Sequence, residues 1–511
     1  MCRKKETLQG SITVFASMSL LLVASFLLVL LEAARVKGLE AYGRIQRTNA
    51  MEAVFSEYDR DLFERYGIFL LDGSYGEQGI QFSRINGRLQ SVSQQNLRPE
   101  IPAQSWNSVQ NFYQMDVTDA SVTGYLLATD YDGGPFREMA VASLKASYPT
   151  ELAQKLYDGL QSSHQAMTQA EQSRSAMDQA QENIQAAKEK QEQEKQAQEE
   201  ASGEAEETQA ASEDAVENPM DIVKAWKQAD ILTLVMPSTS QVSAKEIRGK
   251  ETLEHRRLSQ GNEAWTMSGD WYKKVLYQQF IQMQFACYGA DASGEGALDY
   301  ELEYIHSGKK SDRENLKSVV QQILLMREGI NFIYLQTDAV KQQEAYQVAV
   351  ALAAALGIAP AAGLIAQGIL AAWAYAESIL DVRALLAGGK IPWIKTSESW
   401  SSSLSGLGEL LTGSAQAKKQ ENGEDYRGYL EKLLWLNTER ALNYRAMDLI
   451  ELRAEADGSD PVQMDEMILA LRADLVYEAE ALFSKMVTVK PLQTDRWEFS
   501  DTVYDSYLSK E

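Results

Sequence analysis

Residues 11–31 form a continuous run without a single charged side chain, and this run limits what the chain can fold into more than any other feature. As one α-helix it is long enough to cross a hydrocarbon core about 30 Å thick. The run is longer than the apolar core of a secretory signal, and no small-x-small cleavage site follows it. We therefore interpret it as a retained transmembrane helix; a cleaved signal peptide is the alternative.

Basic residues lie on both sides of this run, so charge alone does not set its orientation. A short tail stays inside a cell more easily than it crosses the membrane, whereas a long domain can be exported despite nearby positive charge. We expect residues 1–10 to be a cytoplasmic leader. The sequence thus predicts a single-pass protein of the cell membrane whose N-terminus is cytoplasmic and whose bulk is extracellular.

The composition narrows the classes of function. The chain has 511 residues, 45% of them hydrophobic, and a formal net charge of −24. This acidic excess argues against nucleic-acid binding, which needs clustered Lys and Arg. Cys2 and Cys287 lie on opposite sides of the predicted span and are not expected to pair. The chain has only three histidines, which weakens a histidine-based catalytic site or zinc site.

Beyond the anchor, the patterns predict a helix-rich α+β ectodomain with a small antiparallel sheet and several packed helices. Its N-terminal half, residues 32–150, is expected to continue one helix from about residue 12 to about residue 65. Residues 68–71 and 115–129 are expected to form strands, because both segments are rich in β-branched and large apolar side chains.

The C-terminal half, residues 220–511, is expected to hold most of the helices. Strict alternation of apolar and acidic residues predicts a strand over 298–304. Apolar spacing and capping residues predict the helices at 268–287, after Ser311, at 425–453 and at about 461–485, and a closing strand at 486–490.

Two segments have unusual composition. Residues 151–219 are rich in Gln, Glu, Ala and Lys, so we expect an acidic, solvated insertion that is helical or disordered; a coiled coil is the alternative. Residues 348–376 form a second uncharged run, built from Ala and Gly and split at Gly357 and Pro360. We expect a buried helical hairpin there. A membrane-inserted segment is the alternative, and it would return residues 378–511 to the cytoplasm.

Enzyme motifs are incomplete. Gly388-Gly389-Lys390 lacks the Ser or Thr of a phosphate loop, and the glycine of Asp130-Tyr131-Asp132-Gly133 comes too early for a calcium loop. On an alternating strand, Glu301 and Glu303 would face solvent. We therefore predict no catalytic, cofactor-binding or metal-binding residues, no cofactor and no enzymatic activity.

The N-terminus carries the most specific motif. Basic residues, Gly10 and the sequence Ser-Ile-Thr-Val-Phe at residues 11–15 precede the apolar helix. This arrangement resembles prepilin-type leaders, and most closely those of TadE/TadG-like proteins of tight-adherence pilus systems. A peptidase cuts such leaders after the glycine, so the resemblance implies a prepilin peptidase as partner and Gly10, Ser11 and Phe15 as processing residues. Pilins usually carry Glu at the position of Phe15.

The body of the chain resembles an uncharacterised family of membrane-anchored proteins from Gram-positive bacteria, which often carry the same start. Four stretches carry this resemblance: residues 118–125, 298–308, 374–395 and 442–452. The resemblance implies a Tad-like pilus or secretion locus and no known activity.

We therefore expect a non-catalytic surface protein, pseudopilin-like, that is a structural or assembly component of a Tad-like pilus or secretion system. Its expected partners are membrane lipid, through the N-terminal helix, and other pilus proteins; no nucleic acid or small-molecule substrate is evident. The alternatives are an independent binding or sensing ectodomain tethered to the membrane, and a membrane-tethered hydrolase.

Overall fold

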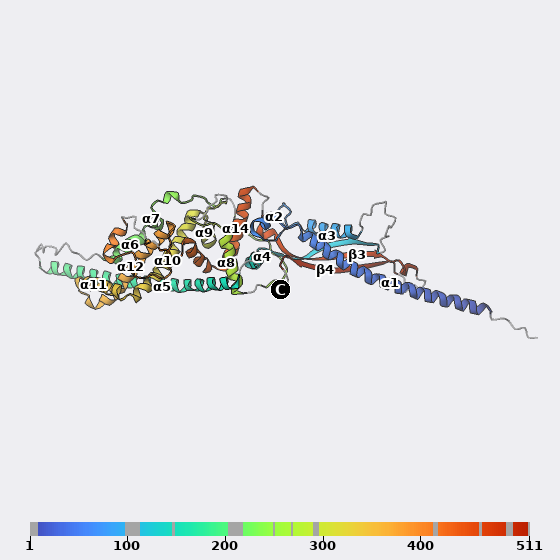
Figure 1. Ribbon diagram of the computed structural model, residues 1–511, viewed down its shortest axis with the longest axis horizontal. Coiled ribbons are helices and arrows are strands. Elements are labelled where there is room, and N and C mark those ends of the chain that lie inside the picture. Colours follow the sequence, from blue (N-terminus) through green and yellow to red (C-terminus); the bar gives the residue numbers. More distant parts are fainter. Residues whose placement is uncertain are drawn as a thin grey trace, which may run out of the picture. The chain divides into compact units, whose positions relative to one another are not determined.

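The computed structural model describes most of the chain, and the account below is confined to the residues that it describes. These are residues 9–97, 113–145, 149–202, 218–248, 251–266, 269–289, 296–411, 417–418, 420–458, 462–486 and 494–508. The chain divides into two compact units, and each is described by itself. The sheet unit comprises Met1–Ser143, Arg257–Met267 and Asp460–Glu511, and the helical unit comprises Leu144–Arg256 and Ser268–Ser459. The predicted class, helix-rich α+β with a small antiparallel sheet, is confirmed (Figure 1).

The sheet unit begins with α1, a helix of 47 residues from Gln9 to Phe55. The prediction that this helix continues to about residue 65 is wrong, because a second N-cap interrupts it. Asp59 accepts a hydrogen bond from the backbone N–H of Leu62 at 2.8 Å and starts α2 (Arg60–Tyr66). Gly67, with φ of +68°, then ends α2 in the left-handed conformation that glycine adopts readily.

The sheet is built around β3 (Met467–Glu480), which is antiparallel to every strand that it pairs with. The strand β2 (Met115–Leu127) pairs along one edge, from Ile468 to Ala479. The other edge pairs with β1 (Leu71–Asp72) at residues 467–468 and with β4 (Arg496–Ser506) at residues 470–480. Segments from both ends of the chain therefore form one sheet.

The strand predicted over 115–129 is present as β2, whereas the helix predicted over 461–485 is wrong. In β3 the side chains of Leu471, Ala473, Leu475 and Tyr477 are buried, and those of the residues between them are more exposed. That is a period of two, the period of a strand with one buried face. The closing strand predicted at 486–490 is also absent where the chain is described: Ser484–Met486 is a 3₁₀ turn, and residues 487–490 lie outside the described ranges.

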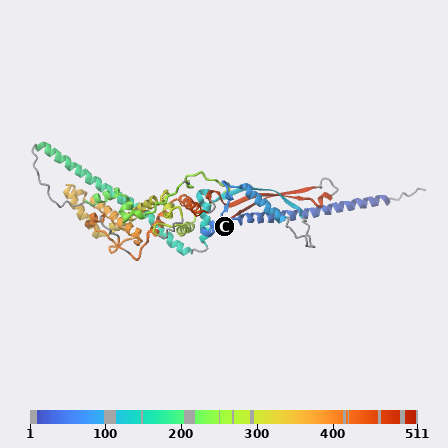
Figure 2. The same cartoon turned by 90° about the horizontal axis from the view of Figure 1, so that it is seen from above.

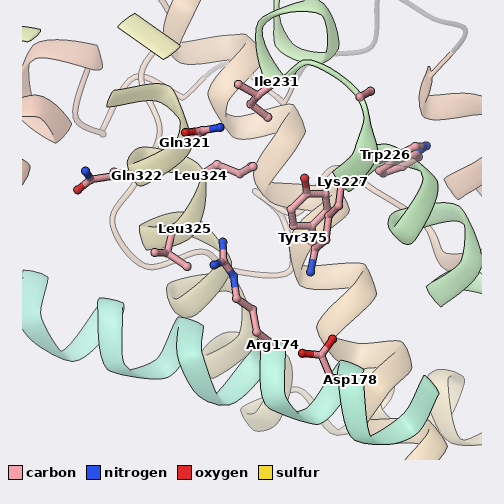
Figure 3. Close-up of a pocket in the computed structure, with 11 residues that line it drawn as sticks. Arg174, Asp178, Trp226, Lys227, Ile231, Gln321, Gln322, Leu324, Leu325 and Tyr375 are labelled. Atoms are coloured by element: carbon pink, nitrogen blue, oxygen red, sulfur yellow. The ribbon is translucent and has the colours of Figure 1, made fainter. Parts of the chain in front are cut away.

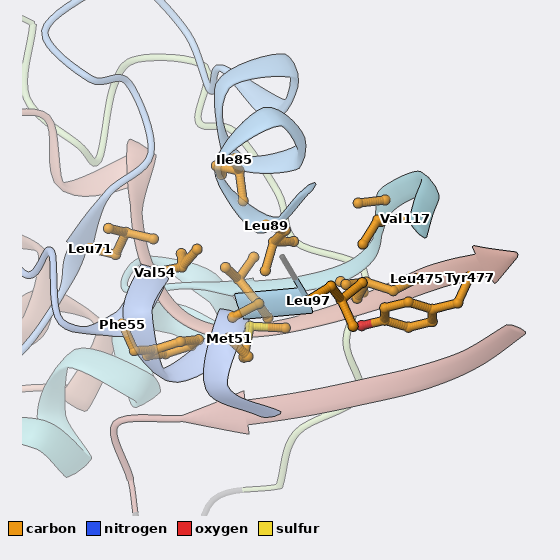
Figure 4. Packing of buried hydrophobic residues seen from close by; sticks show 14 of the residues in the cluster. Met51, Val54, Phe55, Leu71, Ile85, Leu89, Leu97, Val117, Leu475 and Tyr477 are labelled. Carbon is orange, nitrogen blue, oxygen red and sulfur yellow. The ribbon is translucent and has the colours of Figure 1, made fainter. Parts of the chain in front are cut away.

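One face of the sheet is covered by α1 and α3 (Phe82–Leu97), which run along the strands in both views (Figures 1 and 2). The core between them is apolar, and Figure 4 shows part of it. One internal polar contact is satisfied within it, the hydrogen bond of 3.0 Å between the hydroxyls of Ser93 and Tyr477. The sheet unit is completed by α4 (Asp130–Lys145), which begins with left-handed residues at Tyr131, Asp132 and Gly133.

The helical unit is an assembly of helices around α10 and α12, which pack against each other and against α5. Its helices are α5 (Thr150–Ser202), α6 (Pro219–Gln228), α7 (Ile231–Val235), α8 (Trp271–Gln284), α9 (Glu301–Ser307), α10 (Asp312–Thr337), α11 (Ala339–Ala355), α12 (Ala362–Leu386), α13 (Tyr426–Trp435) and α14 (Glu439–Asp457). The helix predicted at 268–287 is α8, and Ser311 caps α10 as predicted. The single helix predicted over 425–453 is instead α13 and α14, because Thr438 caps a new helix.

The strand predicted over 298–304 is wrong, because residues 301–307 form α9. The prediction that Glu301 and Glu303 face solvent is wrong for the same reason: their exposed fractions are 2% and 0%. The alternation that resembled a half-buried strand belongs to a short helix that is buried on all sides. Each acidic side chain has a hydrogen-bond partner from elsewhere in the chain, Arg453 for Glu301 and Tyr426 for Glu303, and no local pattern can reveal those partners.

The segment 151–219 is helical as far as Ser202, but α5 is packed against protein up to Ala187, and it is solvated only beyond that residue, where its described side chains are mostly exposed. Small and apolar residues form one buried stripe along it: Ala153, Leu160, Ala166, Ala170, Ser173, Met177, Ala180, Ile184 and Ala187. Close packing explains how so polar a helix is buried. A Cβ on Gly329 of α10 would lie 2.0 Å from the carbonyl oxygen of Ala166, so glycine permits the two backbones to approach. Residues 203–217 lie outside the described ranges.

The predicted hairpin over 348–376 is present as α11, a bend, and α12. Both α1 and the segment Ala359–Leu386 have the length and apolar composition needed to cross a membrane. They differ in burial: the most apolar window of α1 is 6% buried, whereas that of Ala359–Leu386 is 83% buried within the protein. The second run therefore has protein rather than lipid around it in this structure.

We predict that Gly329→Val destabilises the helical unit by about 1–3 kcal/mol, because the new side chain must push α5 away from α10. Thermal unfolding of the full chain in detergent measures the effect. Gly363→Ala is the matched control, since a Cβ at Gly363 meets nothing within 4 Å. Equal melting temperatures for the two variants would contradict the close packing of α5.

Candidate functional site

The residues that the sequence analysis assigned to leader processing lie together at the start of α1. Gly10 and Ser11 belong to its first turn, and Phe15 follows one turn later with its side chain 73% exposed. Residues 1–8, and Cys2 with them, lie outside the described ranges. Cleavage after Gly10 stays a prediction.

The first half of α1 exposes apolar side chains around its whole circumference. From Ile12 to Val23 its large apolar side chains have exposed fractions of 56% to 73%, whereas Leu28 and Val29 near its end are half-buried. A helix that is apolar on all sides and has so little protein around it has the composition of a membrane-spanning segment or a signal sequence. The chain therefore carries an N-terminal apolar helix of membrane-spanning length.

At the end of this apolar half, two charged residues fix α1 to the sheet. We call them the Glu32–Arg35 latch. Their side chains form an ion pair of 3.0 Å, and the exposed fractions are 2% for Glu32 and 3% for Arg35. Arg35 also donates to the carbonyl oxygens of Glu480, at 2.8 Å, and of Tyr113.

The carboxylate of Glu32 caps the chain where β3 ends. Its Oε2 accepts the backbone N–H groups of Leu482 at 3.1 Å, Phe483 at 2.6 Å and Ser484 at 3.3 Å. Its Oε1 accepts the indole N–H of Trp497 in β4 at 3.0 Å. Burial alone would raise the pKa of Glu32, but these backbone donors and Arg35 outweigh it and lower the pKa. Glu32 is therefore an anion at neutral pH, at the point where the apolar half ends.

The latch continues into the apolar core along one stripe of α1. After Glu32 and Arg35, the buried positions recur every three or four residues: Leu39, Gly43, Gln46, Arg47, Ala50, Met51 and Val54. Within this stripe, Arg47 pairs with Asp501 of β4 at 2.5 Å. The helix is thus fixed to the sheet from residue 32 to its C-terminus.

The helical unit contains a fully buried ion cluster of two cations and two anions. Arg327 pairs with Asp381 at 2.9 Å, and Lys395 pairs with Asp381 at 2.6 Å and with Glu377. Burial would raise the pKa of Asp381, but Arg327 and Lys395 lower it, so the cluster is ionised and electrically balanced. All four side chains are at most 2% exposed. The cluster joins α10, α12 and the segment after α12, and its burial points to a structural role.

Two further carboxyl groups are buried around α9. Glu303 accepts the backbone N–H of Tyr288 at 2.9 Å and the hydroxyl of Tyr426 at 2.8 Å, and burial raises its pKa to about 7. Asp448 accepts the hydroxyl of Tyr304 at 2.9 Å, and burial raises its pKa to about 7 as well. Neither carboxyl group is available on the surface.

In the part of the chain that the structure describes, the thiol, the imidazole and the acidic groups considered next do not form a reactive or metal-binding site. Burial raises the pKa of the Cys287 thiol to about 12, so this thiol is inert. Burial lowers the pKa of His306 to about 4, so its imidazole is neutral. Within the described ranges, no three His, Cys, Asp or Glu side chains are grouped so that they could hold a metal ion.

A groove of about 550 Å³ opens on the surface of the helical unit (Figure 3). Its lining includes Arg174 and Asp178 of α5, Lys227 of α6, Gln321 of α10 and Tyr375 of α12. These residues are far apart in the sequence, so sequence analysis had no means of grouping them. The Glu32–Arg35 latch did leave a signal, namely an opposite-charge pair at i and i+3 directly after the apolar run.

Comparison with known proteins gives one match. Residues 209–479, just over half of the chain, match a family of unknown function, DUF5702. The chain therefore belongs to this family. The matched region runs from before α6 to the end of β3, so it includes parts of both units. No curated protein and no solved structure gives a significant match.

We predict that Glu32→Ala destabilises the sheet unit by about 3–5 kcal/mol, because it leaves Arg35 buried without its anion and removes the acceptor of three backbone N–H groups. Hydrogen exchange at residues 482–484 should become faster. Glu40→Ala is the control, because its pair with Lys37 is exposed and contributes little. Unchanged exchange in the Glu32 variant would contradict the latch.

We predict that Glu303→Gln changes how stability depends on pH. The folded state holds a proton on Glu303 up to about pH 7, whereas an unfolded glutamate loses it near pH 4.5. The wild-type chain therefore loses stability as pH rises through this window, by about 3 kcal/mol from Glu303. The amide cannot ionise. The stability of the variant relative to the wild type should therefore increase from pH 4.5 to pH 7.5.

Melting temperatures of the two proteins across this pH range measure the difference. Glu344→Gln is the control, because Glu344 is exposed on α11. A difference between wild type and Glu303→Gln that stays constant with pH would contradict the prediction.

Proposed function

We propose that this DUF5702 protein is a non-catalytic, membrane-anchored surface protein, pseudopilin-like, that serves as a structural or assembly component of a Tad-like pilus or secretion system. Its N-terminus is cytoplasmic, it crosses the membrane once, and its bulk is extracellular. The observation that carries the proposal is α1: one uninterrupted helix whose first half is apolar and exposed and whose second half is docked along an antiparallel sheet.

The junction between the two halves supports this role. A tethered ectodomain with an independent function needs only a flexible linker above the membrane. Here the helix continues past residue 31 without a break, and the Glu32–Arg35 latch fixes it to the sheet within one turn. The anchor and the sheet unit therefore form one rigid element. Such rigidity suits a subunit that assembles through its apolar helix and must keep its ectodomain in a fixed orientation relative to that helix.

The apolar half itself offers an assembly surface. In the bilayer, a helix associates with other helices through side-chain packing, and small residues permit close contact. Residues 11–31 contain Ser and Ala among the Leu and Val side chains, including Ala16, Ser17 and Ser19. This composition supports contacts with neighbouring apolar helices as well as with lipid.

A binding ectodomain is the second candidate function, and the groove of about 550 Å³ in the helical unit favours it. The third candidate, a membrane-tethered hydrolase, is motivated by the abundance of carboxylates in the chain. The pair Glu301 and Glu303 gives it no support, because both side chains are buried and Glu301 is paired with Arg453, with 2.7 Å between its Oε1 and the arginine Nε.

Site-specific cross-linking in cells tests the assembly role. In a Cys2→Ser background, Leu22→Cys places a thiol in the apolar half, where Leu22 is 69% exposed. We expect oxidation to form a disulfide between the introduced thiols of two copies, which joins their apolar helices. Cys287 can stay in place, because it is buried and its raised pKa makes it unreactive.

Ala50→Cys is the matched control, because Ala50 is buried against the sheet and should give no adduct. If Leu22→Cys gives no more adduct than Ala50→Cys, α1 is surrounded by lipid alone and the assembly role fails. The mass of the native N-terminus tests processing on the same material: a chain that begins at Ser11 supports a prepilin leader, and one that begins at Met1 contradicts it.

A further inference from the structure

The groove on the helical unit has the size and the setting of a small-molecule site. Its volume of about 550 Å³ lies in the range typical of ligand pockets, and four helices supply its main walls. Arg174 and Asp178 extend from α5, while Lys227 and Tyr375 approach from the helices opposite (Figure 3). The close packing of α5 against α10 and α12 holds these walls in place.

Two cationic side chains in the groove, Arg174 and Lys227, have more N–H donors than nearby acceptors. The guanidinium of Arg174 reaches one carboxylate, Glu328, through its Nε at 3.5 Å, and its side chain remains 47% exposed. The ammonium of Lys227 lies 3.8 Å from the sulfur of Met177 and 4.9 Å from the ring centroid of Tyr375. Among the described residues, no carboxylate lies within 4.0 Å of this ammonium.

Two carboxyl groups act on these cations, Asp178 in the lining of the same groove and Glu328. Glu328 is 1% exposed, and burial raises its pKa, so its environment disfavours the anion. Crowding by protein atoms lowers the pKa of Lys227, because its ammonium has lost part of its hydration. A ligand anion between Arg174 and Lys227 would give both cations a charged hydrogen-bond acceptor.

The remaining lining mixes apolar and polar side chains. The ring of Tyr375 and the side chains of Leu324 and Ile231 offer an apolar wall. Gln321 and Asp178 can bond to an amide or hydroxyl group of a ligand. A bare inorganic anion would leave this wall and these polar groups unused.

We propose that the groove binds a small organic acid whose apolar body carries an amide or hydroxyl group. Arg174 and Lys227 hold the carboxylate, Tyr375 and Leu324 contact the apolar body, and Gln321 bonds to the amide or hydroxyl. The proposal does not depend on the pilus role, since every residue that it uses belongs to the helical unit.

Isothermal titration calorimetry of the full chain in lipid nanodiscs tests the proposal, with empty nanodiscs as blank. The probe is N-acetyl-L-phenylalanine, and the control ligand is its uncharged analogue, N-acetyl-L-phenylalaninamide. We expect the acid to bind and the amide to bind about tenfold more weakly, because a hydrogen-bonded charge pair is lost. No heat from the acid at millimolar concentration, or equal affinities for acid and amide, would overturn the proposal.

Variants of the cations locate the site. Arg174→Gln and Lys227→Gln should each weaken binding of the acid about tenfold and bring its affinity close to that of the amide. Lys190→Gln makes the same change in net charge at an exposed position farther along α5, and it should leave the affinity unchanged. Lys227→Arg keeps the charge and should retain binding, which separates loss of the cation from loss of the fold. Full affinity in both glutamine variants would overturn the assignment.

Discussion

The Glu32–Arg35 latch is the interaction on which the sheet unit depends. It lies at the point where α1 passes from an apolar, exposed half to a half that is buried against protein. A buried charge is costly unless it is paired and hydrogen-bonded, and each member of the latch is both. Because its acceptors and donors come from β3, β4 and the residues after β3, the latch also closes the end of the sheet.

The helical unit depends on a different constraint, the close approach of α5. A long helix rich in Gln and Glu provides few large apolar side chains, so it gains burial through small residues and short interhelical distances. Gly329 and Gly368 make this approach possible on the partner helices. The buried ion cluster around Arg327 and Asp381 then fixes α10, α12 and the segment at Lys395 with directional bonds that apolar contacts lack.

In the proposed function, the two units have different roles. The sheet unit and α1 form a rigid anchor whose apolar half is free for lipid or neighbouring helices. The helical unit carries the groove, which is lined by the cations Arg174 and Lys227. The family match covers most of the helical unit but begins after α5, which supplies Arg174 and Asp178. One wall of the groove therefore lies outside the matched region.

The sequence by itself determined the features whose physical cause is local. The apolar run of residues 11–31 predicts a membrane-spanning helix by length alone, Ser311 caps α10, and the β-branched residues of 115–127 form β2. Tertiary structure decided the rest. The alternation over 298–304 predicted a strand, but the partners of Glu301 and Glu303 come from distant segments and make a buried helix stable. Burial of α5, the strand β3, the latch and the groove likewise depend on groups that only folding brings together, and local periodicity carries no information about such partners.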